Sequence, residues 1–316
     1  MGNNSKRGML FGFIGVVCFS LTLPATSIAV PYFGETIVGL GRTVVAAIIV
    51  SIIFIIKKES LPNKKQLKSL SIVAAGAVLA FPLLSTFAMK SLPVSHGAIE
   101  TALLPLATAG FAMWRGGERP SKRYWIASII GAVTVLLYAV YLGLGQLQKG
   151  DMALIVAVLL LGLSYAEGGK LSKELGSWQV IAWAILIGAP FFIIPVGLSI
   201  SVNMLQAPIE AWISLFYLAV VSQFLAYIAW YGGMSLGGIA KVGQIQYLQP
   251  FLMIGFSVLF LGESITWLTI VLAIVVVICV IIGKNAPVIK KESKGTVLIG
   301  DNRKFCVEKG TTSSNC

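Results

Sequence analysis

The sequence is poor in charged residues and has only one histidine. Of its 316 residues 11% are charged and 12 are acidic, whereas about a quarter of the residues in a soluble domain carry a charge. So few charged side chains cannot cover a surface that faces water. Together with the 57% hydrophobic content, this scarcity predicts a protein that is integral to a membrane.

Motifs of enzymes and of nucleotide-driven machines are also missing. The chain has no G-x-x-x-x-G-K-[ST] loop, no dinucleotide-binding motif and no zinc spacing, and its four cysteines follow no disulfide framework. We therefore expect no enzyme activity, no cofactor and no metal. The net charge of +12 lies in short gaps between apolar runs, which argues against a nucleic-acid partner.

The long apolar runs indicate the fold class. A membrane-spanning helix needs roughly 20 apolar residues, because the hydrocarbon core is about 30 Å thick. Runs of this scale lie at about 8–30, 35–56, 70–90, 94–114, 124–142, 151–170, 178–198, 211–232, 239–260 and 266–283. They predict an all-α integral membrane protein with ten transmembrane helices and the lipid bilayer as its surroundings. The polar residues 284–316 are expected to form a disordered cytoplasmic tail.

The positions of Lys and Arg indicate the orientation. If the N-terminus is cytoplasmic, the inner gaps hold the basic clusters at 57–68 and 115–123, whereas the outer gaps hold only Lys90 and Lys149. Basic residues favour the cytoplasmic side of a membrane. We therefore expect a multi-pass protein of the plasma or inner membrane with both termini in the cytoplasm.

One phrase occurs twice in the chain. LLPLATAGFAMWRGGERP (103–120) and YLQPFLMIGFSVLFLGESI (247–265) each contain a proline followed at the same distance by Gly-Glu, at Glu118 and at Glu263. Five apolar runs precede residue 145 and five follow it, so the two halves enter the membrane in opposite senses. The chain is thus predicted to contain inverted repeats at 1–145 and 146–283, an arrangement typical of secondary transporters with a site between the halves.

The two phrases resemble the signature segments of EamA-type members of the drug/metabolite transporter superfamily. LLLGLSYAEGGKLSKELGSWQV at 159–180 is similar to the start of that family's second repeat, so the resemblance covers about residues 8–283. It implies ten helices and a central cavity lined mainly by the third, fourth, eighth and ninth spans, with help from the first and sixth. Members mostly export amino acids, metabolites or toxic compounds. One departure is that Arg42 precedes Thr43, where the family often has an aromatic residue.

Five ionisable residues within or at the ends of the spans are candidates for coupling or gating: Arg42, His96, Glu100, Glu167 and Lys241. A charge inside the bilayer is costly without a partner or water. Arg42 and Glu100 both lie roughly 10 Å deep from the outer side, so they can form an ion pair. The alternative is that the Arg42 side chain reaches back to the headgroups.

His96 and Glu100 share a helical face, and histidine titrates near neutral pH, so together they are candidates for proton coupling. The alternative for His96 is an interfacial residue at the start of a helix. Glu167 and Lys241 are predicted to form a second ion pair near the cytoplasmic mouth. The alternative pairs Glu167 with Lys170 and leaves Lys241 as a basic residue of the inner face.

Polar and aromatic side chains in the eighth and ninth spans are candidates for contact with a solute. The set comprises Gln223, Trp230, Gln244, Gln246, Tyr247 and Gln249. Amide groups in hydrocarbon need a partner or a wet cavity, although hydrogen bonds between helices are the alternative for each. The glycine pairs Gly8/Gly12 and Gly233/Gly237 have the GxxxG spacing of helix contacts, which is a weak signal in a glycine-rich chain.

These features predict a secondary transporter that exports small organic metabolites such as amino acids by alternating access, with proton coupling as an option. Its partner would be a small-molecule substrate. The alternatives are an uncoupled facilitator or importer, and a membrane sensor or scaffold without transport. The sequence names neither the solute nor the oligomeric state, for which a homodimer is one alternative.

Overall fold

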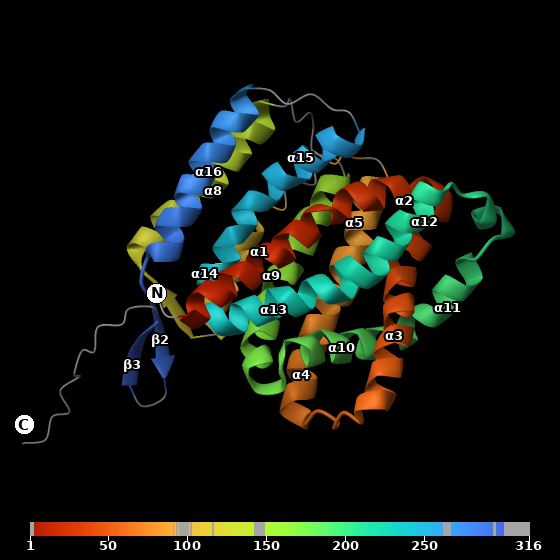
Figure 1. Ribbon diagram of the computed structural model, residues 1–316, viewed down its shortest axis with the longest axis horizontal. Helices are drawn as coiled ribbons and strands as arrows, with labels where there is room; N and C mark the ends of the chain where they lie inside the picture. The colour runs from red at the N-terminus through yellow and green to blue at the C-terminus, as the bar shows by residue number, and fades with distance from the viewer. Residues whose placement is uncertain are drawn as a thin grey trace, which may run out of the picture.

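The computed structural model describes residues 3–90, 92, 94, 101, 103–115, 117–141, 149–261, 267–292 and 295–299. The candidate residues His96 and Glu100, and Glu263 of the repeated phrase, lie outside this set. The described residues form helices that cross one another at different inclinations, with a small sheet at one end (Figure 1).

The N-terminal helices form one long apolar run, which is broken at a glycine. Its elements are α1 (Asn3–Ser20), α2 (Thr22–Thr36), η1 (Ile37–Gly41) and α3 (Arg42–Lys57). The 54 residues of Asn4–Lys57 would be about 80 Å long as one helix, more than twice the hydrocarbon thickness. Gly34, with φ 73° and ψ 169°, breaks the run, because glycine adopts this conformation without the cost of a Cβ.

The rest of the first half follows the predicted runs. It consists of α4 (Lys64–Val73), η2 (Ala74–Ala80), α5 (Phe81–Met89), α7 (Leu104–Arg115), β1 (Glu118–Pro120) and α8 (Lys122–Tyr141). Asn63 caps α4, because its side chain accepts a hydrogen bond from the Gln66 N–H while the Gln66 side chain bonds back to Asn63.

The second half contains one broken span and one sharp break between spans. Its elements are α9 (Lys149–Leu175), α10 (Ser177–Gly188), α11 (Pro190–Ser199), η3 (Val202–Gln206), α12 (Ile209–Phe216), η4 (Tyr217–Leu225), α13 (Ala226–Gly237), α14 (Ile239–Gly243), η5 (Gln244–Leu248), α15 (Gln249–Leu261) and α16 (Trp267–Asn285). Helices α10 and α11 are bent by 59° next to Pro190. Helices α13 and α14 are separated by Gly238, whose φ is 90°.

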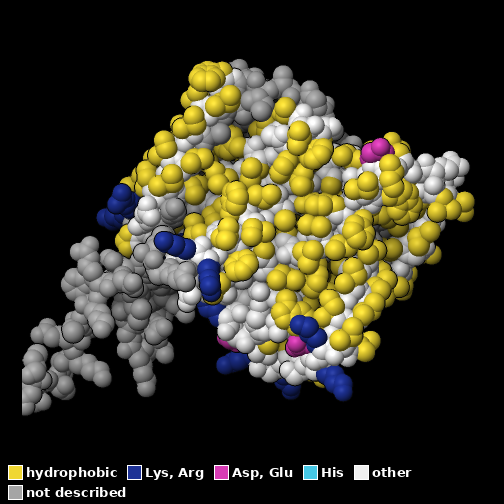
Figure 2. All heavy atoms as spheres, viewed as in Figure 1, with side chains coloured by type: hydrophobic (Ala, Val, Ile, Leu, Met, Phe, Trp, Pro, Cys, Tyr) yellow, Lys and Arg dark blue, Asp and Glu magenta, His cyan; other side chains and the backbone are white. Residues whose placement is uncertain are grey.

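The helices confirm an all-α integral membrane fold. Among the described residues, four helices are long and apolar enough to cross a membrane, or five if α10 and α11 count as one span. Figure 2 shows a broad hydrophobic face across the middle of the molecule, with Lys and Arg at its lower and left margins. Large apolar side chains such as Ile55 and Leu198 are exposed, as suits a surface that faces lipid. The total of ten crossings stays a prediction.

Two helix pairs far apart in the sequence pack closely. Helix α1 lies along α13, and α8 lies along α16 (Figure 1). The first contact is made by the glycines with GxxxG spacing: a Cβ built on Gly233 would lie 2.6 Å from the Gly12 nitrogen and 2.8 Å from the Gly8 oxygen. The weak GxxxG signal therefore marks a real contact between the first and eighth predicted spans.

A three-stranded antiparallel sheet in the order β1-β2-β3 lies near the start of α1 (Figure 1). Strand β1 pairs with β2 (Val288–Glu292), with Glu118 opposite Lys290, and β2 pairs with β3 (Gly295–Ile299). This differs from the disordered tail that was expected from residue 284 onward. The segment was read as a tail because of its polar composition. The hairpin of β2 and β3 is completed by β1, which comes from the distant loop at 118–120.

Five helical segments of the described residues depart from α geometry. Segments η3 and η5 are 3₁₀-helical, and η1, η2 and η4 are π-helical. Each π-helical segment directly precedes or contains a residue that lines the central cavity described below. Single π-helical turns of this kind are rare and occur frequently at functional sites. Here the π-helical segments widen the helical turn of the spans around the cavity.

Candidate functional site

An internal cavity lies among the helices of both halves. Its empty volume is about 350 Å³, in narrow gaps that leave room for about one water molecule. It is lined by Phe19, Thr22, Arg42, Ala77, Phe81, Pro82, Leu104, Leu161, Tyr165, Ser222, Gln223, Tyr227 and Gln249. These residues come from the first, second, third, fourth, sixth, eighth and ninth predicted spans, so the lining includes every span that the resemblance implied and adds the second.

Arg42 is the charged residue of this lining. It begins α3, directly after the π-helical segment η1, and it is only 1% exposed. Its Nε and Nη1 atoms have no hydrogen-bond partner among the described residues. The predicted partner Glu100 lies outside those residues, so the Arg42–Glu100 pair stays a prediction. The alternative in which Arg42 reaches the headgroups does not fit its burial at the cavity wall.

Two of the predicted glutamines line the same cavity. Gln223 lies in η4 and Gln249 begins α15, and both are buried. The Nε2 atom of Gln223 and the Oε1 atom of Gln249 have no hydrogen-bond partner among the described residues. The cavity therefore offers an amide donor, an amide acceptor and a guanidinium to whatever enters it.

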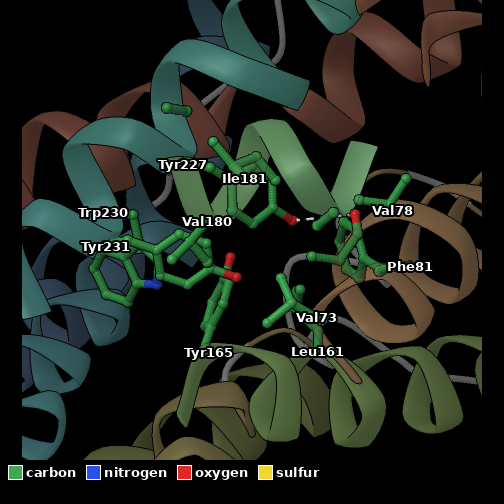
Figure 3. Packing of buried hydrophobic residues seen from close by; sticks show 14 of the residues in the cluster. Val73, Val78, Phe81, Leu161, Tyr165, Val180, Ile181, Tyr227, Trp230 and Tyr231 are labelled. Carbon is green, nitrogen blue, oxygen red and sulfur yellow. Dashed lines mark hydrogen bonds between the residues drawn. The ribbon is translucent and has the colours of Figure 1, made fainter. Parts of the chain in front are cut away.

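Hydroxyl groups hold the helices around the cavity together. Thr22 Oγ1 and Ser222 Oγ lie 2.8 Å apart, which joins α2 to η4 across the two halves. The Tyr227 hydroxyl donates to the Ala77 carbonyl over 3.4 Å, and the dashed line in Figure 3 marks this bond. Both contacts connect the cavity to π-helical segments.

An aromatic cluster forms one side of the cavity. Tyr165, Tyr227, Trp230 and Tyr231 converge in Figure 3, and Phe19 packs edge-on against Tyr227 with ring centroids 4.9 Å apart. Trp230, one of the predicted substrate-binding residues, is fully buried behind this wall and is not part of the lining, although its Nε1 has no partner among the described residues. It shapes the wall through Phe19 and Tyr165.

The remaining predicted residues of the ninth span point elsewhere. Gln244 donates through Nε2 to Ser128 Oγ over 2.9 Å, and the Tyr247 hydroxyl donates to the Ser128 carbonyl over 2.8 Å. Both therefore bind the ninth span to α8. Gln246 is fully buried without a partner for either amide atom among the described residues, and it does not line the cavity.

Glu167 lies at a second, open cleft with a charged lining. Its carboxylate accepts a hydrogen bond from Ser69 Oγ at 2.6 Å and forms an ion pair with Arg115 Nε at 3.0 Å. The structure thus gives Glu167 partners from α4 and α7 in place of the predicted Lys241. The alternative neighbour Lys170 lines the same cleft. Lys241 itself is buried in α14.

Glu118 of the repeated phrase binds the backbone at the break between α13 and α14. Its two carboxylate oxygens accept hydrogen bonds from the Ile239 and Ala240 N–H groups, at 2.9 and 2.8 Å. The Tyr124 hydroxyl donates to the Ala240 carbonyl over 2.9 Å. The loop after α7 in the first half thereby holds the start of the ninth span in the second half.

Several functional contacts were absent from the candidates drawn from the sequence. Thr22 and Ser222 at the cavity lie in no quoted motif, and each is the other's partner across 200 residues of chain. Tyr165 and Arg115 lie within the quoted segments 159–180 and 103–120, but those segments do not identify their positions at the cavity and beside Glu167. The contact made by Glu118 had a signal, namely the repetition of its phrase around Glu263, although the repetition does not identify the partner.

Comparisons with known proteins place the chain in a family. The model of the EamA-like transporter family matches residues 6–140 and 148–283. The chain is 38% identical over 279 residues to the uncharacterized transporter YdeK of Bacillus subtilis, covering 88% of this chain and 97% of the relative. The chain therefore belongs to the EamA-like transporter family, and it is a membrane protein of a family of transporters.

A more distant relative and a solved structure are also similar to the chain. The chain is 19% identical to a "probable terminal-alkyne amino-acid exporter" of Streptantibioticus cattleyicolor, over 78% of this chain and 83% of that protein. A solved crystal structure shares the fold with a TM-score of 0.66 at 16% identity, covering 88% of this chain and 98% of the other.

Within the described residues, no group of three or more His, Cys, Asp or Glu side chains could hold a metal ion.

Proposed function

We propose that the protein is a secondary transporter that exports small organic metabolites such as amino acids by alternating access. The observation that carries this proposal is the cavity between the two halves, with buried polar groups from both halves in its lining. Inverted-repeat transporters bind their solutes at such a seam and expose it to each side in turn. The family of transporters to which the chain belongs, and the exporter named among its distant relatives, support the proposal.

The cavity corresponds to a closed stage of such a cycle. It leaves room for about one water molecule, so a metabolite can enter only after the surrounding helices move apart. The bond between Thr22 and Ser222 and the cap that Glu118 places on α14 both join the two halves. We infer that such contacts open and close in turn. The proposal also places both termini in the cytoplasm, and it includes as an option that a pH gradient drives transport through Glu100, with or without His96.

Counterflow in proteoliposomes tests the transport function. Vesicles loaded with unlabelled leucine, phenylalanine or glutamine receive the same labelled amino acid outside, and protein-free vesicles serve as the control. We expect saturable uptake of at least one tracer above the control. An imposed pH gradient should drive its accumulation if protons are coupled, and Glu100→Gln should remove that accumulation while exchange persists.

The alternatives give different results in the same vesicles. An uncoupled facilitator exchanges the tracer but never accumulates it under a pH gradient. A sensor or scaffold shows no protein-dependent flux for any amino acid or other small metabolite, and this outcome would contradict the proposed function.

A further inference from the structure

The Arg42 guanidinium is a buried cation with two unpaired nitrogens. It is 1% exposed, and neither Nε nor Nη1 has a hydrogen-bond partner among the described residues. Removal of a charge from water is costly unless the charge is paired and hydrogen-bonded. A guanidinium in this state at the wall of a cavity therefore has a strong affinity for an anion that enters the cavity.

We propose that the transported solute carries a carboxylate and that Arg42 binds this group. The inference rests on the transport function proposed above and names the class of solute. A guanidinium is planar and presents its N–H groups in pairs that match the two oxygens of a carboxylate. Of the described residues that line the cavity, Arg42 alone carries a full charge at neutral pH. One positive charge fits a monoanion such as a carboxylate better than a phosphate with two charges.

The surroundings of Arg42 define the rest of the solute. Gln223 and Gln249 line the same cavity with an unpaired donor and an unpaired acceptor. They match a second polar group on the solute, such as an ammonium, a hydroxyl or an amide. Phe19, Tyr165 and Tyr227 supply aromatic surface for an apolar part. A small carboxylic acid with one further polar group fits all three features.

Matched acids and amides test the inference in the vesicles described above. Leucine, phenylalanine and glutamine are compared with leucinamide, phenylalaninamide and glutaminamide as competitors and as tracers. The wild-type protein should prefer each acid by at least about ten-fold, because a charge-assisted bidentate pair is lost with the amide. Arg42→Gln should abolish that preference, and Arg42→Lys should reduce it. Arg123→Gln, which removes an exposed positive charge, is the control and should keep the preference.

A binding measurement makes the test independent of transport. The thermal unfolding midpoint of the purified protein is measured with sodium propionate, with propionamide and with sodium chloride at equal ionic strength. Propionate alone should raise the midpoint of the wild type and of Arg123→Gln, and it should have no effect on Arg42→Gln. Without ligand, Arg42→Gln should unfold no earlier than the wild type, because it removes an unpaired buried charge.

The outcomes separate this inference from the proposed function. If acids and amides exchange equally well, transport stands and the carboxylate inference is overturned. If neither class exchanges, the proposed amino-acid transport fails, and the propionate shift then decides whether Arg42 binds carboxylates. An equal propionate shift in the wild type and Arg42→Gln, or no shift in the wild type, also overturns the inference. If Arg42→Gln fails to fold, the carboxylate inference is overturned, and a structural ion pair between Arg42 and Glu100 takes its place.

Discussion

At the scale of single residues, one contact that joins the two halves is made by a polar group at a helix break. Glu118 shows the principle. The break at Gly238 frees the first N–H groups of α14, and the Glu118 carboxylate accepts two of them. A carboxylate is well suited to this position, because free N–H groups at a helix start attract negative charge.

Substitution of Glu118 tests the strength of this contact. Glu118→Ala leaves two buried N–H groups without a partner, and each lost hydrogen bond to a charged group costs about 1.5–3 kcal/mol. We expect a clearly lower thermal unfolding midpoint in detergent, measured by the loss of the monodisperse peak in size-exclusion chromatography. Glu118→Gln should lie between Glu118→Ala and the wild type, since an amide oxygen can still accept one bond.

Glu210→Ala provides the matched control, because Glu210 is an exposed carboxylate in the first turn of α12. It should unfold close to the wild type. If Glu118→Ala also unfolds at the wild-type temperature, the cap contributes little to stability, and the connection of the two halves depends on other contacts.

At the scale of helices, one close contact between the two halves depends on glycine. Helices α1 and α13 approach each other where Gly8 and Gly12 face Gly233 and Gly237. In lipid such an approach is stabilised by close contact rather than by the hydrophobic effect. The first span of the first half is thereby fixed to the eighth span, which carries Tyr227 and Trp230.

A single methyl group should disturb this contact. In Gly233→Ala the new Cβ would lie within 3 Å of backbone atoms of Gly8 and Gly12, so the helices must separate. We expect a loss of about 1–3 kcal/mol, as for other overpacked sites, seen as a lower yield of folded protein and a lower unfolding midpoint. Gly255→Ala, whose Cβ meets nothing within 4 Å, should behave like the wild type. Equal behaviour of the two variants would contradict the close contact.

Helix periodicity explains which parts of the site could be predicted. The apolar runs located the helices, because their length and composition follow from the thickness of the bilayer. Periodicity also placed part of the ninth span correctly. Gln244 and Tyr247, three residues apart, share a face in an α-helix and in the 3₁₀ helix η5 alike, and both reach Ser128. Periodicity does not show, however, that this face meets α8 rather than the cavity.

Long-range partners were beyond the sequence for a different reason. Glu167 was recognised as an ion-pair residue, but the choice of Arg115 over Lys241 depends on how α4, α7 and α9 meet. The depth of Arg42 in the second span left two alternatives open, burial beside Glu100 and reach to the headgroups, and the structure shows the side chain buried. Its position at the cavity wall depends on the approach of η4, which carries Gln223. Composition and periodicity contain no information on such meetings.

At the scale of the whole molecule, the predicted orientation can be tested at two exposed leucines. Leu61, between α3 and α4, and Leu205, in η3, are 84% and 74% exposed. The distribution of basic residues predicts that Leu61 faces the cytoplasm and Leu205 the outside. In a cysteine-free background, a membrane-impermeant maleimide should label Leu205→Cys in intact cells. Leu61→Cys should react only after permeabilisation, and labelling of both in intact cells would contradict the orientation.

The π-helical segments have a consequence for how the molecule can change shape. A π-helical turn holds one residue more than an α-helical turn, and each residue of an α-helix occupies about 100° of rotation. If the extra residue of η4 moved one turn along its helix, the side chains it passed would swing by about that angle. Gln223 and Ser222 could then face a different neighbour while both ends of the span kept their places. Such a helix would rotate its middle part and keep both of its ends where they are.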